Sequence, residues 1–148
     1  MKQLLLKFAL LIAFSTSASA QSPDPTVGGA GGDVIRVTTL EKEGPGSLAE
    51  ALATPGPRII VFEVGGVIDL ERSSLAIAEP FVTIAGQTAP SPGITLIRGG
   101  IDVNTHDVKL QHLRVVVGAD GLPKRHGWEA DAFSTRSAHR VLVENNSF

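Results

Sequence analysis

Ile59-Ile60-Val61-Phe62 is the first of four short β-branched runs that recur along this chain of 148 residues. The other three runs are Phe81–Ile84, Val108–Leu110 and Val141–Val143. Successive runs begin roughly 20 to 35 residues apart, which is typical of solenoids, where each unit buries its apolar face on the next. The pattern therefore predicts a stack of coils built from short strands.

Short strands separated by glycine and proline would also fit a β-sandwich. Two details favour a parallel β-helix instead. The hairpin dipeptide Asn-Gly is absent from the chain, and Val108–Leu113 can be laid on Val141–Asn146. In that alignment Asn146 takes the place of Leu113, and an asparagine is tolerable there because its amide can bond neighbouring backbone. We therefore expect an all-β parallel β-helix, a solenoid, over residues 21–148.

One short helix is expected just before the first run. Ser47-Leu48-Ala49-Glu50 is a capping box, and Pro55–Pro57 stops the helix because proline disfavours a helical conformation in the preceding residue. The apolar stripe consists of Leu48, Ala51 and Leu52. About two turns of helix are unstable alone. The helix is therefore expected to cover the open apolar end of the coil stack.

The first 20 residues have the features of a signal peptide. Lys2 and Lys7 give a positive start, Phe8–Phe14 is apolar, and Ala18-Ser19-Ala20 is a small-residue cleavage signal. The apolar stretch is short for a membrane span, and it lacks the polar alternation of a buried amphipathic helix. The sequence predicts an exported protein, secreted or periplasmic, with no membrane association after cleavage.

Composition excludes several classes of function. The formal net charge is −2 and becomes more negative when Lys2 and Lys7 leave with the signal peptide, so nucleic acid is not an expected partner. The chain has no cysteine, which excludes disulfides and cysteine zinc sites. Gly28–Gly32 is not followed by the Lys-Ser/Thr of a phosphate loop, and we interpret it as a requirement of backbone geometry.

Several stretches of the chain resemble the pectate lyase family, in particular exported bacterial pectate lyase-like proteins. These stretches are Gly31–Thr38, Gly44–Ala51, Arg58–Phe62, Gly66–Leu70, Thr83–Pro90, His112–Arg114 and Asp131–Ser134. The resemblance implies a right-handed parallel β-helix. It also implies cleavage of galacturonan by β-elimination with Ca²⁺ as cofactor, and polygalacturonate or pectin, both acidic polysaccharides, as the partner.

The resemblance matches Asp131 with a calcium ligand of the family. Glu129 lies two residues earlier, so in an extended strand both carboxylates would face the same side and would repel unless a cation lies between them. The alternative is that both acids are solvated loop residues. Lys124 and Arg125 form the densest basic patch, and we interpret them either as ligands of galacturonate carboxylates or as a solvated loop.

The end of the chain departs from the family pattern. Glu144-Asn145-Asn146 stands where the family shows Asp-His-Cys or Asp-His-Val, and the resemblance places the remaining calcium ligands and the catalytic arginine beyond Val141–Phe148. No arginine of this chain is therefore assigned as catalytic. We expect an inactive portion of a lyase, truncated at its C-terminus. The alternative is a non-enzymatic exported β-helix that binds acidic polysaccharide.

Overall fold

The computed structural model describes residues 26–118, 122–123 and 129–148, which form short strands, one α-helix and one 3-10 turn. In chain order these are β1 (Asp33–Val37), α1 (Leu48–Ala53), β2 (Arg58–Phe62), β3 (Gly66–Asp69), β4 (Leu75–Ile77), β5 (Val82–Ala85), η1 (Gly86–Thr88), β6 (Ile94–Ile97), β7 (Ile101–Val103), β8 (His106–Gln111), β9 (Leu113–Val116), β10 (Phe133–Thr135) and β11 (His139–Glu144). Within the described ranges, no helix is long and apolar enough to cross a membrane.

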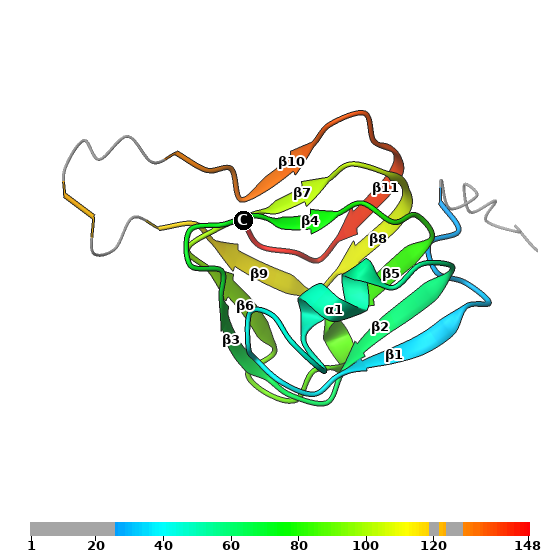
Figure 1. The fold of residues 1–148 in the computed structure, drawn as a ribbon, viewed down its shortest axis with the longest axis horizontal. Helices are drawn as coiled ribbons and strands as arrows, with labels where there is room; N and C mark the ends of the chain where they lie inside the picture. The colour runs from blue at the N-terminus through cyan, green and yellow to red at the C-terminus, as the bar shows by residue number, and fades with distance from the viewer. Residues whose placement is uncertain (1–25, 119–121, 124–128) are drawn as a thin grey trace, which may run out of the picture.

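The strands form three parallel sheets (Figure 1). One sheet has five strands in the order β1-β2-β5-β8-β11, and the other two have three strands each, β3-β6-β9 and β4-β7-β10. From β2 onward the chain visits the three sheets in turn and adds one strand to each on every circuit. This arrangement is a parallel β-helix, which confirms the predicted fold class.

The core is built from columns of apolar side chains that face inward at the same position of successive coils. Ile60, Ile84 and Leu110 are register partners on β2, β5 and β8, and all three are buried. Burying one such side chain contributes roughly 1.5 to 3 kcal/mol. The pairing of Val108 with Val141 is as the sequence predicts.

Strand β2 begins one residue before the first apolar run. Val82 pairs with Arg58 rather than with Ile59. The reason is that Arg58 itself occupies an inward position with a fully buried side chain. An alignment that counts only apolar residues therefore begins the first run one residue too late.

Helix α1 is capped as the sequence predicts. The Ser47 hydroxyl accepts from the Glu50 amide at 3.2 Å, and the Glu50 carboxylate accepts from the Gly46 amide at 2.6 Å. The apolar stripe of Leu48, Ala51 and Leu52 is buried, and the helix contacts β1, β2 and β4. It therefore covers the end of the coil stack that contains β1.

Asn146 confirms the expected role of an asparagine at a coil corner. Its side-chain oxygen accepts from the Leu113 amide at 2.7 Å, and its nitrogen donates to the Leu110 carbonyl at 2.8 Å. His112, which precedes β9, has a φ of 56°, and Asn145 on the next coil has a φ of 54°. The same corner conformation is thus repeated on neighbouring coils.

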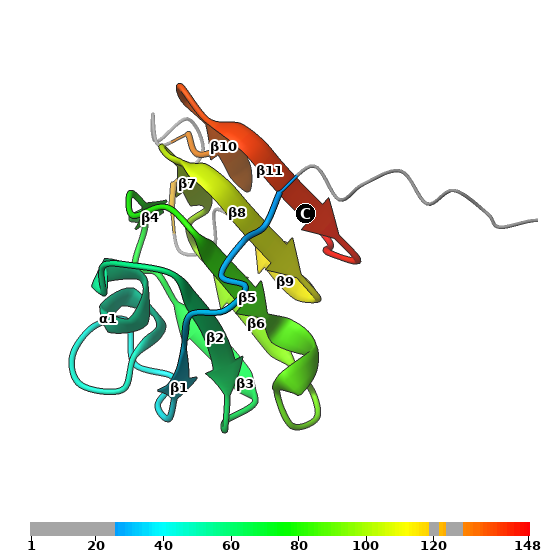
Figure 2. The same ribbon diagram turned by 90° about the vertical axis from the view of Figure 1, so that its right-hand side faces the viewer.

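Residues 26–32, which we call the N-terminal strap, cross the outer face of the five-stranded sheet (Figure 2). The Gly29 amide donates to the Thr83 hydroxyl at 3.0 Å. A Cβ atom on Gly29 would lie 1.7 Å from the Arg58 carbonyl oxygen, and one on Gly32 would lie 1.9 Å from that of Pro57. The glycines are required because the strap lies directly on other backbone, which supports the geometric interpretation of Gly28–Gly32.

Candidate functional site

A polar cavity of about 370 Å³ lies on the outer face of the β4–β7–β10 sheet. Its charged and hydroxyl lining includes Arg72, Asp102, Glu129, Asp131, Ser134 and Arg136. These residues come from three successive coils, because Arg72 precedes β4, Asp102 lies in β7, and Ser134 lies in β10. Parallel stacking of short strands therefore assembles this cavity from residues that are distant in the sequence.

Asp102 points into the cavity because it alternates with two core residues. Ile101 and Val103 on either side are fully buried, so the carboxylate between them faces outward. Ser134 is the register partner of Asp102 on β10, and its hydroxyl donates to the Asp102 carboxylate. Sequence reasoning missed Asp102, although the apolar-acid-apolar pattern of Ile101-Asp102-Val103 was a signal that could have found it.

Glu129 and Asp131 both line the cavity and both are exposed. They do not lie in an extended strand, contrary to the expectation, because β10 begins only at Phe133. The segment is instead held by β7, where the Ile101 amide donates to the Ala132 carbonyl at 3.0 Å. The two acids therefore line the cavity because β7 holds their segment there, and not because they alternate along a strand.

Gly100 allows this segment to approach β7. A Cβ atom at this position would lie 1.8 Å from the Asp131 carbonyl oxygen and 3.1 Å from that of Ala132. These distances are far below van der Waals contact. Any larger residue at position 100 would push the acidic segment outward, so Gly100 positions Asp131 without touching its carboxylate.

The donor groups of the cavity fit Ca²⁺ in kind. Carboxylate and hydroxyl oxygens are the ligands that this hard cation prefers, and Asp131 and Glu129 supply the exposed carboxylates. Among the described residues, no group of three histidine, cysteine, aspartate or glutamate side chains is placed to hold a metal ion. Two acids can therefore be only part of a coordination shell of six to eight oxygens.

Lys124 and Arg125, the basic patch that sequence analysis assigned to substrate, lie outside the described residues. Their role stays a prediction. Within the part of the chain that the structure describes, Arg72 and Arg136 are the cations that line the cavity. Sequence analysis did not assign either of them to substrate.

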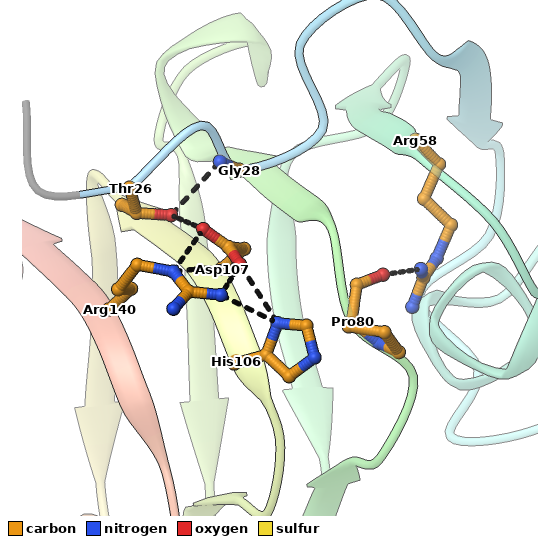
Figure 3. Close-up of polar contacts among 7 residues, drawn as sticks. All are labelled: Thr26, Gly28, Arg58, Pro80, His106, Asp107 and Arg140. Carbon is orange, nitrogen blue, oxygen red and sulfur yellow. Dashed lines mark hydrogen bonds and ion pairs between the residues drawn. The ribbon is translucent and has the colours of Figure 1, made fainter.

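A second polar cluster surrounds the buried carboxylate of Asp107 (Figure 3). Arg140 Nε lies 2.9 Å from one carboxylate oxygen and 3.0 Å from the other, and Arg140 Nη2 donates at 2.5 Å. The Thr26 hydroxyl, in the N-terminal strap, donates at 3.3 Å, and His106 Nδ1 lies 2.8 Å away. The hydrogen bond from Arg140 is the main reason that the pKa of Asp107 lies well below its usual range.

The Asp107 cluster is a structural site rather than a catalytic one. A strongly shifted carboxyl in an open cleft would suggest function. Here the carboxylate lies beneath the strap, and its acceptors are filled by Arg140, Thr26 and His106. The cluster joins the strap to β8 and β11, and it leaves no acceptor facing a ligand.

Arg58 is a second structural polar group, also drawn in Figure 3. Its guanidinium donates to the carbonyls of Ala51 and Leu52 at 3.1 and 2.7 Å, which lie in the last turn of α1. It also donates to the carbonyls of Gly56, Glu79 and Pro80. Burial lowers the pKa of Arg58, and Glu79 opposes this effect. The arginine thereby fastens α1 to the first two coils.

No protein family model matches the chain. It is 46% identical over 96 residues to probable pectate lyase C of Emericella nidulans, covering 64% of this chain and 22% of that protein. It is 34% identical over 146 residues to probable pectate lyase C of Aspergillus fumigatus, covering 93% of this chain and 33% of that protein. The chain thus spans between about a fifth and a third of the length of these curated relatives.

The fold also has a match among solved structures. The crystal structure of jun a 1, the major allergen from cedar pollen, superimposes with a TM-score of 0.62. The match has 24% sequence identity and covers 80% of this chain and 38% of the allergen chain. At that identity the likeness concerns the fold alone.

Proposed function

We propose that this chain, which is pectate lyase-like in sequence and fold, binds pectate-type acidic polysaccharide in the polar cavity, with Ca²⁺ held by Asp131 and Glu129. The observation that carries the proposal is the meeting of these two exposed acids with Arg72 and Arg136 in one cavity. The names of the curated relatives supply the substrate class.

The charges of the cavity support an anionic ligand bound together with a cation. A uronate carboxylate is repelled by Glu129 and Asp131 unless a cation lies between them. When bound, Ca²⁺ would neutralise that carboxylate and favour removal of the neighbouring proton. Arg72 and Arg136 line the same cavity and can pair directly with further carboxylates.

In a lyase this chemistry would proceed to β-elimination, which leaves a new double bond in the sugar product. We propose that the present chain contributes the binding coils and carries no turnover by itself. Arg140 does not line the cavity, and its guanidinium is held on Asp107. The second candidate function is a non-enzymatic β-helix that binds acidic polysaccharide, for which the exposed acids and the arginines of the cavity would suffice.

Binding and turnover can be measured separately on the full chain. We expect polygalacturonate to bind in the presence of Ca²⁺ and to be released by a chelator. Ultraviolet absorbance of the unsaturated product should stay at background. Binding that ignores the chelator would remove calcium from the proposal, and the absence of binding would remove the substrate. Chelator-sensitive turnover would show that the chain is an active lyase.

We also propose that the protein is exported and that its leader is cleaved between Ala20 and Gln21. The supporting features are the positive start, the apolar stretch and the Ala18-Ser19-Ala20 sequence. N-terminal sequencing of protein recovered outside the cytoplasm should begin at Gln21. A recovered chain that still begins at Met1 would contradict this proposal.

A further inference from the structure

A second recess, which we call the cap-side hollow, adjoins the polar cavity. Its volume is about 140 Å³, and its wall includes Lys42, Ala49, Leu70 and Ala76. Ser73 and Ser74 line both the hollow and the cavity. The two recesses therefore meet at this pair of serines, which precedes β4.

Strand register shows that the recesses follow one another along the coil stack. Ala76, Asp102 and Ser134 are partners on β4, β7 and β10, and each is the middle residue of its strand. Ala76 lines the hollow, whereas Asp102 and Ser134 line the cavity. Neighbouring strands lie about 4.8 Å apart, so the hollow and the cavity follow one another across the three strands of this sheet, which lie side by side in Figure 1.

Lys42 is the cation at the hollow. Its ammonium lies 3.5 Å from the Glu71 carboxylate and 3.7 Å from that of Glu43. Both acids are largely exposed, and exposed ion pairs of this kind are weak. A carboxylate that arrives with a ligand can therefore compete for the ammonium. The wall also includes Glu43 and the serine hydroxyls, while Leu70 and Leu75 are buried behind it. The Ser73 hydroxyl donates to the Leu70 carbonyl at 2.6 Å and can still accept a hydrogen bond from a sugar hydroxyl.

We infer that the bound polysaccharide continues from the polar cavity into the cap-side hollow, where Lys42 pairs with a uronate carboxylate and Ser73 and Ser74 contact sugar hydroxyls. The inference rests on the proposed function. It adds the direction in which the polymer lies and a further binding subsite. The polymer would run across β10, β7 and β4 toward α1. Lys42 would act on long ligands and not on those confined to the cavity.

Calorimetric titration with galacturonate oligomers of increasing length, in the presence of Ca²⁺, tests this inference on the full chain. Lys42→Ala should lower the affinity for the longest oligomers by about fivefold and leave the affinity for the shortest binding oligomer unchanged. Arg36→Ala is the matched control. It removes an exposed arginine that pairs with Glu63 and lines neither recess, so it changes the net charge equally.

Three results would overturn the inference. Equal affinity of Lys42→Ala and wild-type protein for long oligomers would remove the subsite while leaving the proposed function intact. Equal losses in Lys42→Ala and Arg36→Ala would show a general effect of charge, which also removes the subsite. Failure of the wild-type chain to bind any oligomer would reject the proposed function, and the inference would fall with it.

Discussion

The polar side chains of Figure 3 and those of the polar cavity differ in whether protein atoms fill their hydrogen-bonding positions. Arg58 and Asp107 are buried, and protein atoms fill their hydrogen-bonding positions. Glu129 and Asp131 are exposed, and within the described residues no ion pair of either acid is found. The buried groups hold neighbouring coils together, whereas the exposed acids can still bind a ligand. Both kinds are charged residues, so residue type alone does not separate them.

Removing Arg58 should have the largest effect on stability. Arg58→Ala leaves carbonyls at the end of α1 without their donor, and we expect a loss on the order of 3 kcal/mol in the free energy of unfolding. Chemical denaturation measures this value. Arg36→Ala, in the same part of the chain but exposed, should change it by less than about 0.5 kcal/mol. Similar values for the two variants would mean that the buried arginine does not fasten the helix.

Asp107→Asn should cost about 2 kcal/mol at neutral pH, because it removes the charge that Arg140, Thr26 and His106 share. The folded-state pKa of Asp107 is lowered, so the charge stabilises the fold above the ordinary aspartate pKa of about 3.9, and this contribution is lost as the pH falls below it. The stability gap between wild type and variant should therefore narrow in acid. Asp33→Asn, which changes an exposed acid of β1, serves as control. A gap that stays constant down to about pH 2 would contradict the assignment.

Gly100→Ala tests whether backbone packing positions the acids of the cavity. The added methyl group meets the Asp131 carbonyl oxygen, so we expect a cost of about 1 to 3 kcal/mol together with weaker calcium binding. Gly118→Ala adds a methyl group that meets no described atom within 4 Å, and it serves as the control for calcium binding. Its φ of 50° adds a backbone cost that Gly100 does not share, so the stabilities of the two variants are not compared. If both variants bind calcium as wild type does, Gly100 has no influence on the site.

The coil stack could be predicted because it depends on local apolar alternation, repeated from Ile60 to Ile84 to Leu110. The buried position of Arg58 could not be predicted, because an arginine at the start of an apolar run looks like a surface residue until its carbonyl partners are known. The Asp107 cluster could not be predicted, since its partners Thr26 and Arg140 are 81 and 33 residues away in sequence. The outward orientation of Asp102 could have been predicted, because residues that alternate along a strand face opposite sides and its two neighbours are apolar.

Calcium titration of wild-type protein and Asp131→Asn tests the central claim most directly. The substitution removes one charge from an exposed ligand and nearly preserves its shape, so the melting temperature should not change. Asp33→Asn makes the same change of charge outside the cavity and is the control. We expect wild-type protein and Asp33→Asn to bind Ca²⁺ equally, and Asp131→Asn to bind it roughly tenfold more weakly or not at all. Equal affinity in all three proteins, or no calcium binding by the wild-type chain, would contradict it.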